Sequence, residues 1–127
     1  MPNYLSPSQI LRIAEAFLEH PPEVRDLGLL DSALHRPASS MMGQELYPTL
    51  DLKAAALLDS VVNNHALIDG NKRLGLMAVH MFYGLNGEDF DAPHEPLYDL
   101  IMSVADGSNR DLDKIAATLA AWRHPRR

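Results

Sequence analysis

The amino-acid sequence predicts an all-α protein, a compact helical bundle with one small flap loop or hairpin. Apolar residues recur at the 3.6-residue spacing of a helix along most of the 127 residues. Proline, glycine and N-cap residues interrupt this spacing, and no convincing alternation of apolar and polar residues occurs outside residues 36–50. With 46% apolar residues the chain can bury one hydrophobic core, so we expect a single domain over residues 1–127.

The composition argues against several classes of function. A formal net charge of −6 leaves no basic surface for coating nucleic acid. The absence of cysteine excludes disulfides, thiolate zinc sites and a cysteine nucleophile. No apolar run reaches the roughly 18 residues that cross a bilayer, and the N-terminus lacks the profile of a secretory signal. We therefore expect a cytoplasmic protein that contacts neither a membrane nor nucleic acid directly.

The first helix is predicted to begin at a capping box, Ser-Pro-Ser-Gln, in residues 6–9 and to end before the proline pair at 21–22. Its apolar positions follow the helical period: Ile10, Ile13, Ala14, Phe17 and Leu18. A second, shorter amphipathic helix is expected over about residues 28–36.

Residues 36–50 break the helical spacing. Poor helix formers are scattered through them: Pro37, Ser39, Ser40, Gly43 and Pro48. We expect a long loop or a small hairpin, and a loop of this length in a compact domain is often functional. A connector without a role is the alternative. The apolar side chains of Met41, Met42 and Tyr47 favour contact with a partner.

A mostly apolar, alanine-rich helix is predicted to begin near Asp51, which we interpret as its N-cap. Because this helix is apolar on most sides, we expect it at the centre of the bundle, with His65 at its C-terminal end. The next helix should end at the Asn86-Gly87 pair, a typical C-cap.

The last third of the chain is predicted to contain two more helices. One begins near Pro96 and ends at Gly107, and the other starts near Ser108 and Asp111. The acidic run at residues 88–91 is expected to be a solvated loop, and the tail from His124 is expected to be frayed.

The central loop, residues 65–73, has the sequence His-Ala-Leu-Ile-Asp-Gly-Asn-Lys-Arg and joins the two central helices. It contains an imidazole, a carboxylate and two adjacent cations. The asparagine and the cations fall at the start of a helix, where unpaired backbone N–H groups and the helix dipole attract anions. The same residues also suit an ordinary cap and turn. On the residues alone, both interpretations stand.

The string from Asn64 to Arg73 resembles the signature loop of the Fic/Doc family, most specifically that of its Doc branch, the death-on-curing toxins. Fic adenylyltransferases carry glycine where this chain has Lys72 and a second arginine where it has Leu76, so both departures favour the Doc branch. Leu67 replaces the usual phenylalanine and is expected to remain an apolar anchor. Other similar stretches cover nearly the whole chain: residues 10–16, 24–30, 36–37 and 47–50.

The resemblance implies a protein kinase that is the toxin of a type II toxin–antitoxin module. It implies transfer of the γ-phosphoryl group of ATP, with Mg²⁺, to a threonine of translation elongation factor Tu, which arrests translation and growth. His65 would take the proton from the attacking hydroxyl, and Asp69 would bind Mg²⁺. The anion hole and its neutralising charges would come from Gly70, Asn71, Lys72 and Arg73.

The resemblance also implies partners for the flap and for the site. The flap residues Ser39, Ser40, Met41, Met42 and Gly43 would pair with an extended target segment as an added strand. The implied inhibitor is a Phd-type antitoxin, whose disordered C-terminal segment folds on the toxin. Two alternatives remain open at this point: a Fic-type adenylyltransferase, and a non-catalytic binding module with the same fold. The intact His65, Asp69, Asn71 and Arg73 argue against the second alternative.

Overall fold

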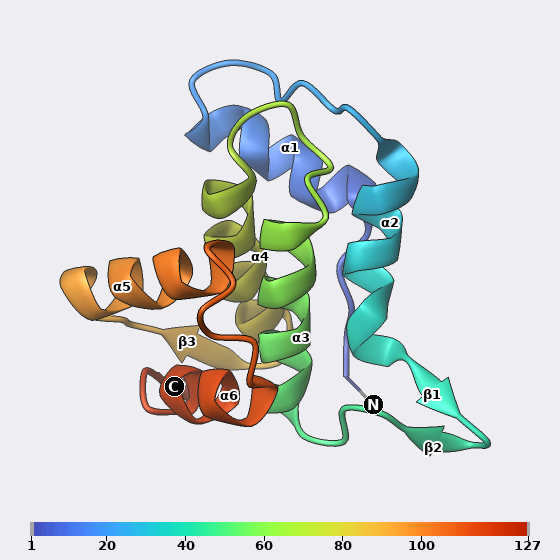
Figure 1. Cartoon of the computed structure of the whole chain (residues 1–127), viewed down its shortest axis with the longest axis vertical. Coiled ribbons are helices and arrows are strands. Elements are labelled where there is room, and N and C mark those ends of the chain that lie inside the picture. Colours follow the sequence, from blue (N-terminus) through green and yellow to red (C-terminus); the bar gives the residue numbers. More distant parts are fainter. Residues whose placement is uncertain (1, 127) are drawn as a thin grey trace.

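The computed structural model describes residues 2–126 and contains six α-helices and two small antiparallel sheets (Figure 1). The predicted all-α class with a small hairpin is confirmed. The helices are α1 (Pro7–Phe17), α2 (Leu27–His35), α3 (Leu50–Asn63), α4 (Asn71–Leu85), α5 (His94–Ala105) and α6 (Leu112–Ala120), and a short 3₁₀-helix, η1 (Arg36–Ala38), follows α2. The predicted capping box at Ser6 and the predicted helix start at Asp111 are both present.

Helix α3 is the central helix, as predicted. Every residue from 53 to 62 is buried, and α2, α4, α5 and α6 all pack against it. The predicted N-cap at Asp51 is wrong, because the Leu52 N–H donates to Thr49 Oγ1 at 3.1 Å and the helix begins at Leu50. Asp51 lies in the first turn, where Arg123 binds its carboxylate. The hairpin precedes the first residue of α3 and the central loop follows its last residue, so these two features lie at opposite ends of the helix.

The hairpin consists of strands β1 (Ser40–Met41) and β2 (Gln44–Glu45), which pair antiparallel through a turn at residues 42–43. Both turn residues have positive φ, 53° at Met42 and 80° at Gly43, which matches the twist that two-residue hairpin turns need. The base of the hairpin is anchored by Lys53 of α3. Its fully buried ammonium donates to Glu45 Oε1 at 2.9 Å and to the carbonyl of Tyr47.

A second sheet, formed by strands β3 (Glu88–Phe90) and β4 (Arg123–Pro125), was not predicted. The acidic run is therefore a strand and not a solvated loop, and the tail is paired as far as Pro125 and not frayed. Ion pairs join the two strands: Arg123 binds Glu88 at 3.0 Å and His124 binds Asp91 at 2.6 Å. Strands of three residues are too short to show an apolar alternation, so the pairing left no local signal in the sequence.

The buried apolar side chains of all six helices form one continuous core. In the described range, 2–126, no helix combines the length and the apolar character that crossing a membrane requires.

Candidate functional site

The loop between α3 and α4 is held in one conformation by its own residues. The Leu67 N–H donates to Asn71 Oδ1 at 3.0 Å, and Asn71 Nδ2 donates to the Leu67 carbonyl at 2.9 Å. Ala66 and Leu67 are buried in the core, so Leu67 is the apolar anchor that the sequence predicted. Both ends of the Asn71 side-chain amide bond to the loop backbone. In the predicted anion hole, Asn71 can therefore contribute only its backbone N–H.

The connection between α1 and α2 crosses this loop and holds it from the other side (Figure 1). The Arg25 guanidinium donates to the His65 carbonyl through Nε at 2.9 Å and Nη2 at 2.6 Å. The Arg25 N–H donates to the Ala66 carbonyl at 2.8 Å, and the Ile68 N–H donates to the Glu23 carbonyl at 3.0 Å. Sequence reasoning missed Arg25, because only the folded chain brings it to a loop 40 residues away.

His65 has a left-handed backbone conformation, with φ of 53°. This region of φ is sparsely populated for residues other than glycine because Cβ crowds the following carbonyl. The contacts from Arg25 fix the conformation, and the exposed imidazole lines a cavity. A strained residue whose side chain lines a cavity is a candidate for function.

Helix α4 begins with unpaired backbone N–H groups. Its N-cap, Gly70, has φ of 93° and offers no side-chain acceptor, and the first backbone bond of the helix runs from Leu74 to the Gly70 carbonyl. No residue within 2–126 accepts a hydrogen bond from the N–H of Asn71, Lys72 or Arg73. These donors and the helix dipole together attract an anion.

A cavity of about 410 Å³ lies at this helix end. The structure brings all the predicted loop residues to it: His65, Asp69, Gly70, Asn71, Lys72 and Arg73. Neither Lys72 nor Arg73 forms an ion pair with another residue of the described range, so both cations remain available to an anion. The site therefore has the donors and the charge for a phosphoryl group and an imidazole beside it.

His20 lines the same cavity from the α1–α2 connection. Its Nδ1–H donates to the Pro21 carbonyl at 3.0 Å, which leaves Nε2 as the acceptor of the ring. Sequence reasoning assigned His20 no role, because a histidine beside two prolines carries no motif.

Asp69 supplies one exposed carboxylate to the cavity. Its Oδ1 accepts the Gly70 N–H at 2.9 Å, and Oδ2 has no partner among the described residues. In that range no three metal-binding side chains gather in one place. Mg²⁺ is commonly held by one or two carboxylates together with substrate phosphates and water. This donor set fits Mg²⁺ that arrives with a nucleotide, with Asp69 as the protein ligand.

The surface becomes apolar beyond Lys72 and Arg73. A hollow of about 500 Å³ between α4 and α5 is lined by these two cations, by His94 and by a largely apolar wall made of Leu76, Leu97, Tyr98, Ile101 and Met102. Leu76, Leu97, Ile101 and Met102 offer no hydrogen bonds to a charged group, so this part of the wall does not suit additional phosphates.

The predicted flap residues do not lie at this cavity. Residues 39–43 belong to the hairpin at the N-terminal end of α3, whereas His65 follows its C-terminal end (Figure 1). The 14 residues of α3 span about 21 Å at about 1.5 Å per residue. Met41 and Met42 are 64% and 98% exposed. The hairpin can therefore contact a partner, but it is remote from a phosphate bound at α4.

Two comparisons place the chain among known proteins. Residues 4–83 match the family model described as the Fic/DOC family. The Toxin Doc of Mycolicibacterium smegmatis (strain ATCC 700084 / mc(2)155) is 42% identical over 126 residues, which cover 96% of this chain and 95% of that protein. The matched range of the family model includes the hairpin, the α1–α2 connection and the whole central loop.

Proposed function

Because this chain belongs to the Fic/DOC family, we propose that it is the toxin of a toxin–antitoxin module and acts as a protein kinase. The reaction is transfer of the γ-phosphoryl group of ATP to a threonine of translation elongation factor Tu, which stops translation in the cytoplasm. One observation carries the proposal: the unpaired N-terminus of α4, with Lys72 and Arg73, lines the same cavity as His65.

The mechanism follows from the groups around the cavity. The His65 imidazole takes the proton of the threonine hydroxyl, whose oxygen forms a new bond to the γ-phosphorus. The bond from that phosphorus to the oxygen bridging the β- and γ-phosphates breaks, and ADP leaves with the electron pair. Arg25 holds the His65 backbone in place throughout. In phosphoryl transfer, such positioning and electrostatic stabilisation supply most of the catalysis.

Charge on the transferred group is met by donors already in place. The N–H groups of Asn71, Lys72 and Arg73 hold its non-bridging oxygens, and the two cationic side chains offset its negative charge. Asp69 is the residue that would hold Mg²⁺, which would supply further neutralisation of phosphate charge when bound.

The apolar wall supports a kinase over an adenylyltransferase. Moving AMP requires the α-phosphate at the anion site with two more phosphates bound beyond it. Leu76 occupies the position where Fic adenylyltransferases carry a second arginine, and Leu76 belongs to the apolar hollow. Lys72 also adds a long side chain where those enzymes have glycine. Both features favour a single phosphoryl group, the terminal one, at the end of α4.

The inhibitor we propose is a Phd-type antitoxin. The name of the M. smegmatis relative, Toxin Doc, and its 42% identity with this chain support an antitoxin as the partner. An antitoxin that covers the cavity would exclude the nucleotide or the target.

Labelled ATP tests the proposal. Purified protein incubated with elongation factor Tu, Mg²⁺ and ATP should transfer label from the γ position and not from the α position. His65→Ala, incubated in parallel, should transfer neither label. Label that arrives from the α position alone would replace the kinase by an adenylyltransferase, and no transfer from either position would favour the non-catalytic binding module.

A further inference from the structure

A second polar cavity, of about 480 Å³, lies along α3 between the hairpin and the central loop. We name it the α3 groove. Its lining extends from Ser39, next to strand β1, to Asn64, the residue before His65. The groove thus lies between the hairpin, which the family resemblance assigns to target binding, and the loop that carries His65. A target segment bound in the groove would span part of the distance of about 21 Å between them.

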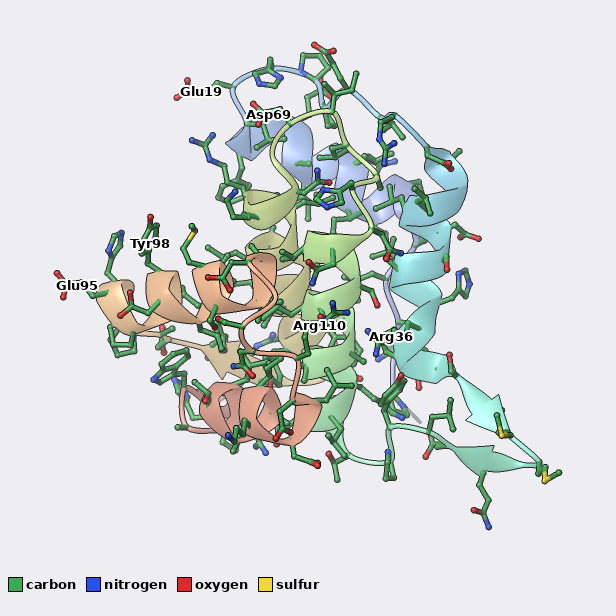
Figure 2. The ribbon with its side chains drawn as sticks, viewed as in Figure 1. Glu19, Arg36, Asp69, Glu95, Tyr98 and Arg110 are labelled. Carbon is green, nitrogen blue, oxygen red and sulfur yellow. The ribbon has the colours of Figure 1, made fainter. Side chains whose placement is uncertain are left out.

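Two arginines meet at one carboxylate in this groove. Arg36 Nη1 lies 2.8 Å from Asp59 Oδ2, and Arg110 Nε lies 3.2 Å from Asp59 Oδ1. Figure 2 shows Arg110 over α3 and Arg36 beside it, toward α2. The side chain of Asp59 is 6% exposed, whereas that of Arg110 is 59% exposed. One carboxylate between two guanidinium groups leaves a local positive charge in a chain whose net charge is −6.

Both arginines retain donors for a ligand. Arg36 uses Nε for the Tyr47 hydroxyl and Nη1 for Asp59 and Ser60. Arg110 uses Nε and Nη2 for Asp59. Within residues 2–126, no group accepts from Arg36 Nη2 or from Arg110 Nη1. Each arginine thus offers one free, positively charged donor nitrogen, so the groove is complementary in charge to a second carboxylate from outside the chain.

Burial alone would lower the pKa of Arg36, but the hydrogen bonds to Asp59 and Tyr47 raise it above its usual value. The guanidinium therefore stays charged, and the groove keeps its positive charge at every working pH.

The distance from Asp59 to His65 determines how far the target's carboxylate would lie from its reacting hydroxyl. Asn63, the last residue of α3, follows Asp59 by four positions, about 6 Å along the helix axis at about 1.5 Å per residue, and His65 follows two residues later. An extended peptide covers the span from Asp59 to His65 in about three residues at about 3.3 Å each.

We propose that the α3 groove holds the acceptor segment of the target in an extended conformation, with an acidic side chain of that segment on Arg36 and Arg110. That side chain lies about three residues from the threonine at His65. The proposal rests on the proposed function, because it assigns the acceptor side of the same site. On this proposal, an ion pair in the α3 groove determines which target is bound, and the phosphate site does not.

Steady-state kinetics with elongation factor Tu test the groove. Arg110→Gln should raise KM for the protein substrate about tenfold and change kcat less than about twofold. Its dissociation constant for ATP with Mg²⁺ should equal that of the wild type. Arg110→Lys should restore part of the loss, because it keeps the charge without the fork. The matched control is Arg12→Gln on α1, which removes the same charge from an exposed arginine outside the groove and should change nothing.

A peptide titration tests the groove without any phosphoryl transfer. The probe is the capped tetrapeptide Thr-Gly-Gly-Glu, compared with Thr-Gly-Gly-Gln, and the readout is the NMR signals of the Arg36 and Arg110 Nε–H groups. Only the glutamate peptide should shift both signals in the wild type, and Arg110→Gln should abolish the shift of the Arg36 signal.

The outcomes separate the two proposals. Binding of the glutamate peptide by a protein that phosphorylates nothing would overturn the proposed function and leave the groove supported. An unchanged KM in Arg110→Gln together with no peptide shift would overturn the groove and leave the kinase intact. If Arg110→Gln leaves KM unchanged but weakens inhibition by the antitoxin, the groove serves the inhibitor and the proposal is wrong.

Discussion

The left-handed backbone of His65 lowers the stability of the fold at a residue that the proposed activity requires. A φ of 53° costs an L-residue about 1–2 kcal/mol, whereas glycine adopts it without this cost. His65 is exposed, so its ring contributes little packing to the core. The histidine therefore remains at a backbone position that favours glycine, as expected when the imidazole is needed for chemistry.

We predict that His65→Gly raises the free energy of unfolding while abolishing phosphoryl transfer. The gain should be roughly 0.5–1 kcal/mol, since the greater flexibility of glycine in the unfolded chain offsets part of the relieved strain. Chemical denaturation measures it.

The control for this prediction is His65→Ala at the same position. Alanine removes the ring but keeps Cβ and the strain, so it should also lose activity yet gain no stability. Equal stability of the glycine and alanine variants would mean that His65 is not strained.

Single residues also show what the sequence could and could not predict about the site. His65, Asp69, Lys72 and Arg73 could be identified because they are nearly contiguous and fall at a helix start. Arg25 and His20 could not, because only the path of the α1–α2 connection brings Arg25 to the His65 carbonyl and His20 to the cavity. The double hydrogen bond of Asn71 to Leu67 was equally hidden, since an asparagine at a helix start suggests a cap.

The pairing of strands β1 and β2 depends on the backbone conformation of the hairpin turn. Residues 42 and 43 both have positive φ, and Gly43 has open space where a side chain would begin. The tip therefore has room for a side chain, but its positive φ suits only residues that tolerate the left-handed region, such as asparagine, and excludes proline, which fixes φ at a negative value.

Gly43→Pro should disrupt the hairpin and lower phosphorylation of elongation factor Tu by at least about tenfold, or about 1.4 kcal/mol in transition-state binding. Proline fixes φ near −65° and has no N–H, so strands β1 and β2 cannot pair. The dissociation constant for ATP with Mg²⁺ should stay unchanged, because the hairpin lies about 21 Å from the site along α3.

Gly43→Asn is the matched control, since asparagine tolerates positive φ in such turns. It should retain full activity. A loss of ATP affinity in Gly43→Pro would place the hairpin at the nucleotide site and contradict its role in target binding.

The elements differ in how well the sequence predicts them, for physical reasons. Helices can be predicted from the local spacing of apolar residues and from cap residues, so Ser6 and Asp111 were identified as helix starts. The N-cap of α3 was misplaced because Thr49 and Asp51 are both good caps, and only the fold selects Thr49. Strands β3 and β4 pair residues some 35 positions apart, so their partners could not be found from local pattern.

At the scale of the whole molecule, one partly buried polar network joins the chain's tail to the core. Arg123 of β4 donates to both oxygens of Asp51 at 3.0 and 2.8 Å, and Tyr83 of α4 donates to the same carboxylate at 2.8 Å. Burial alone would raise the pKa of Asp51, but the hydrogen bonds from Arg123 and Tyr83 and the charge of Arg123 lower it below the ordinary value.

This lowered pKa predicts a loss of stability in acid. A carboxyl group whose pKa is depressed by folding stabilises the protein above its unfolded pKa of about 3.9, and the contribution is lost as the pH falls through the folded pKa. Asp51→Asn should therefore cost roughly 1–2 kcal/mol at pH 7 and less at about pH 2, measured by urea unfolding.

Glu15→Gln on α1 is the control, because Glu15 is exposed and pairs with no described residue. It should leave stability unchanged at both pH values. An Asp51→Asn cost that is the same at neutral and acidic pH would show that the ionised carboxylate does not stabilise the fold.

The burial of Lys53 also determines how the protein reacts with covalent reagents. The chain has only three lysines, Lys53, Lys72 and Lys114, and the ammonium of Lys53 is sealed beneath the hairpin at 1% exposure. Lys72 and Lys114 are exposed, so an amine-selective electrophile meets two lysine side chains, one of them at the candidate phosphate site. A compound that pairs such an electrophile with a phosphate mimic would therefore find Lys72 with little competition from the rest of the surface.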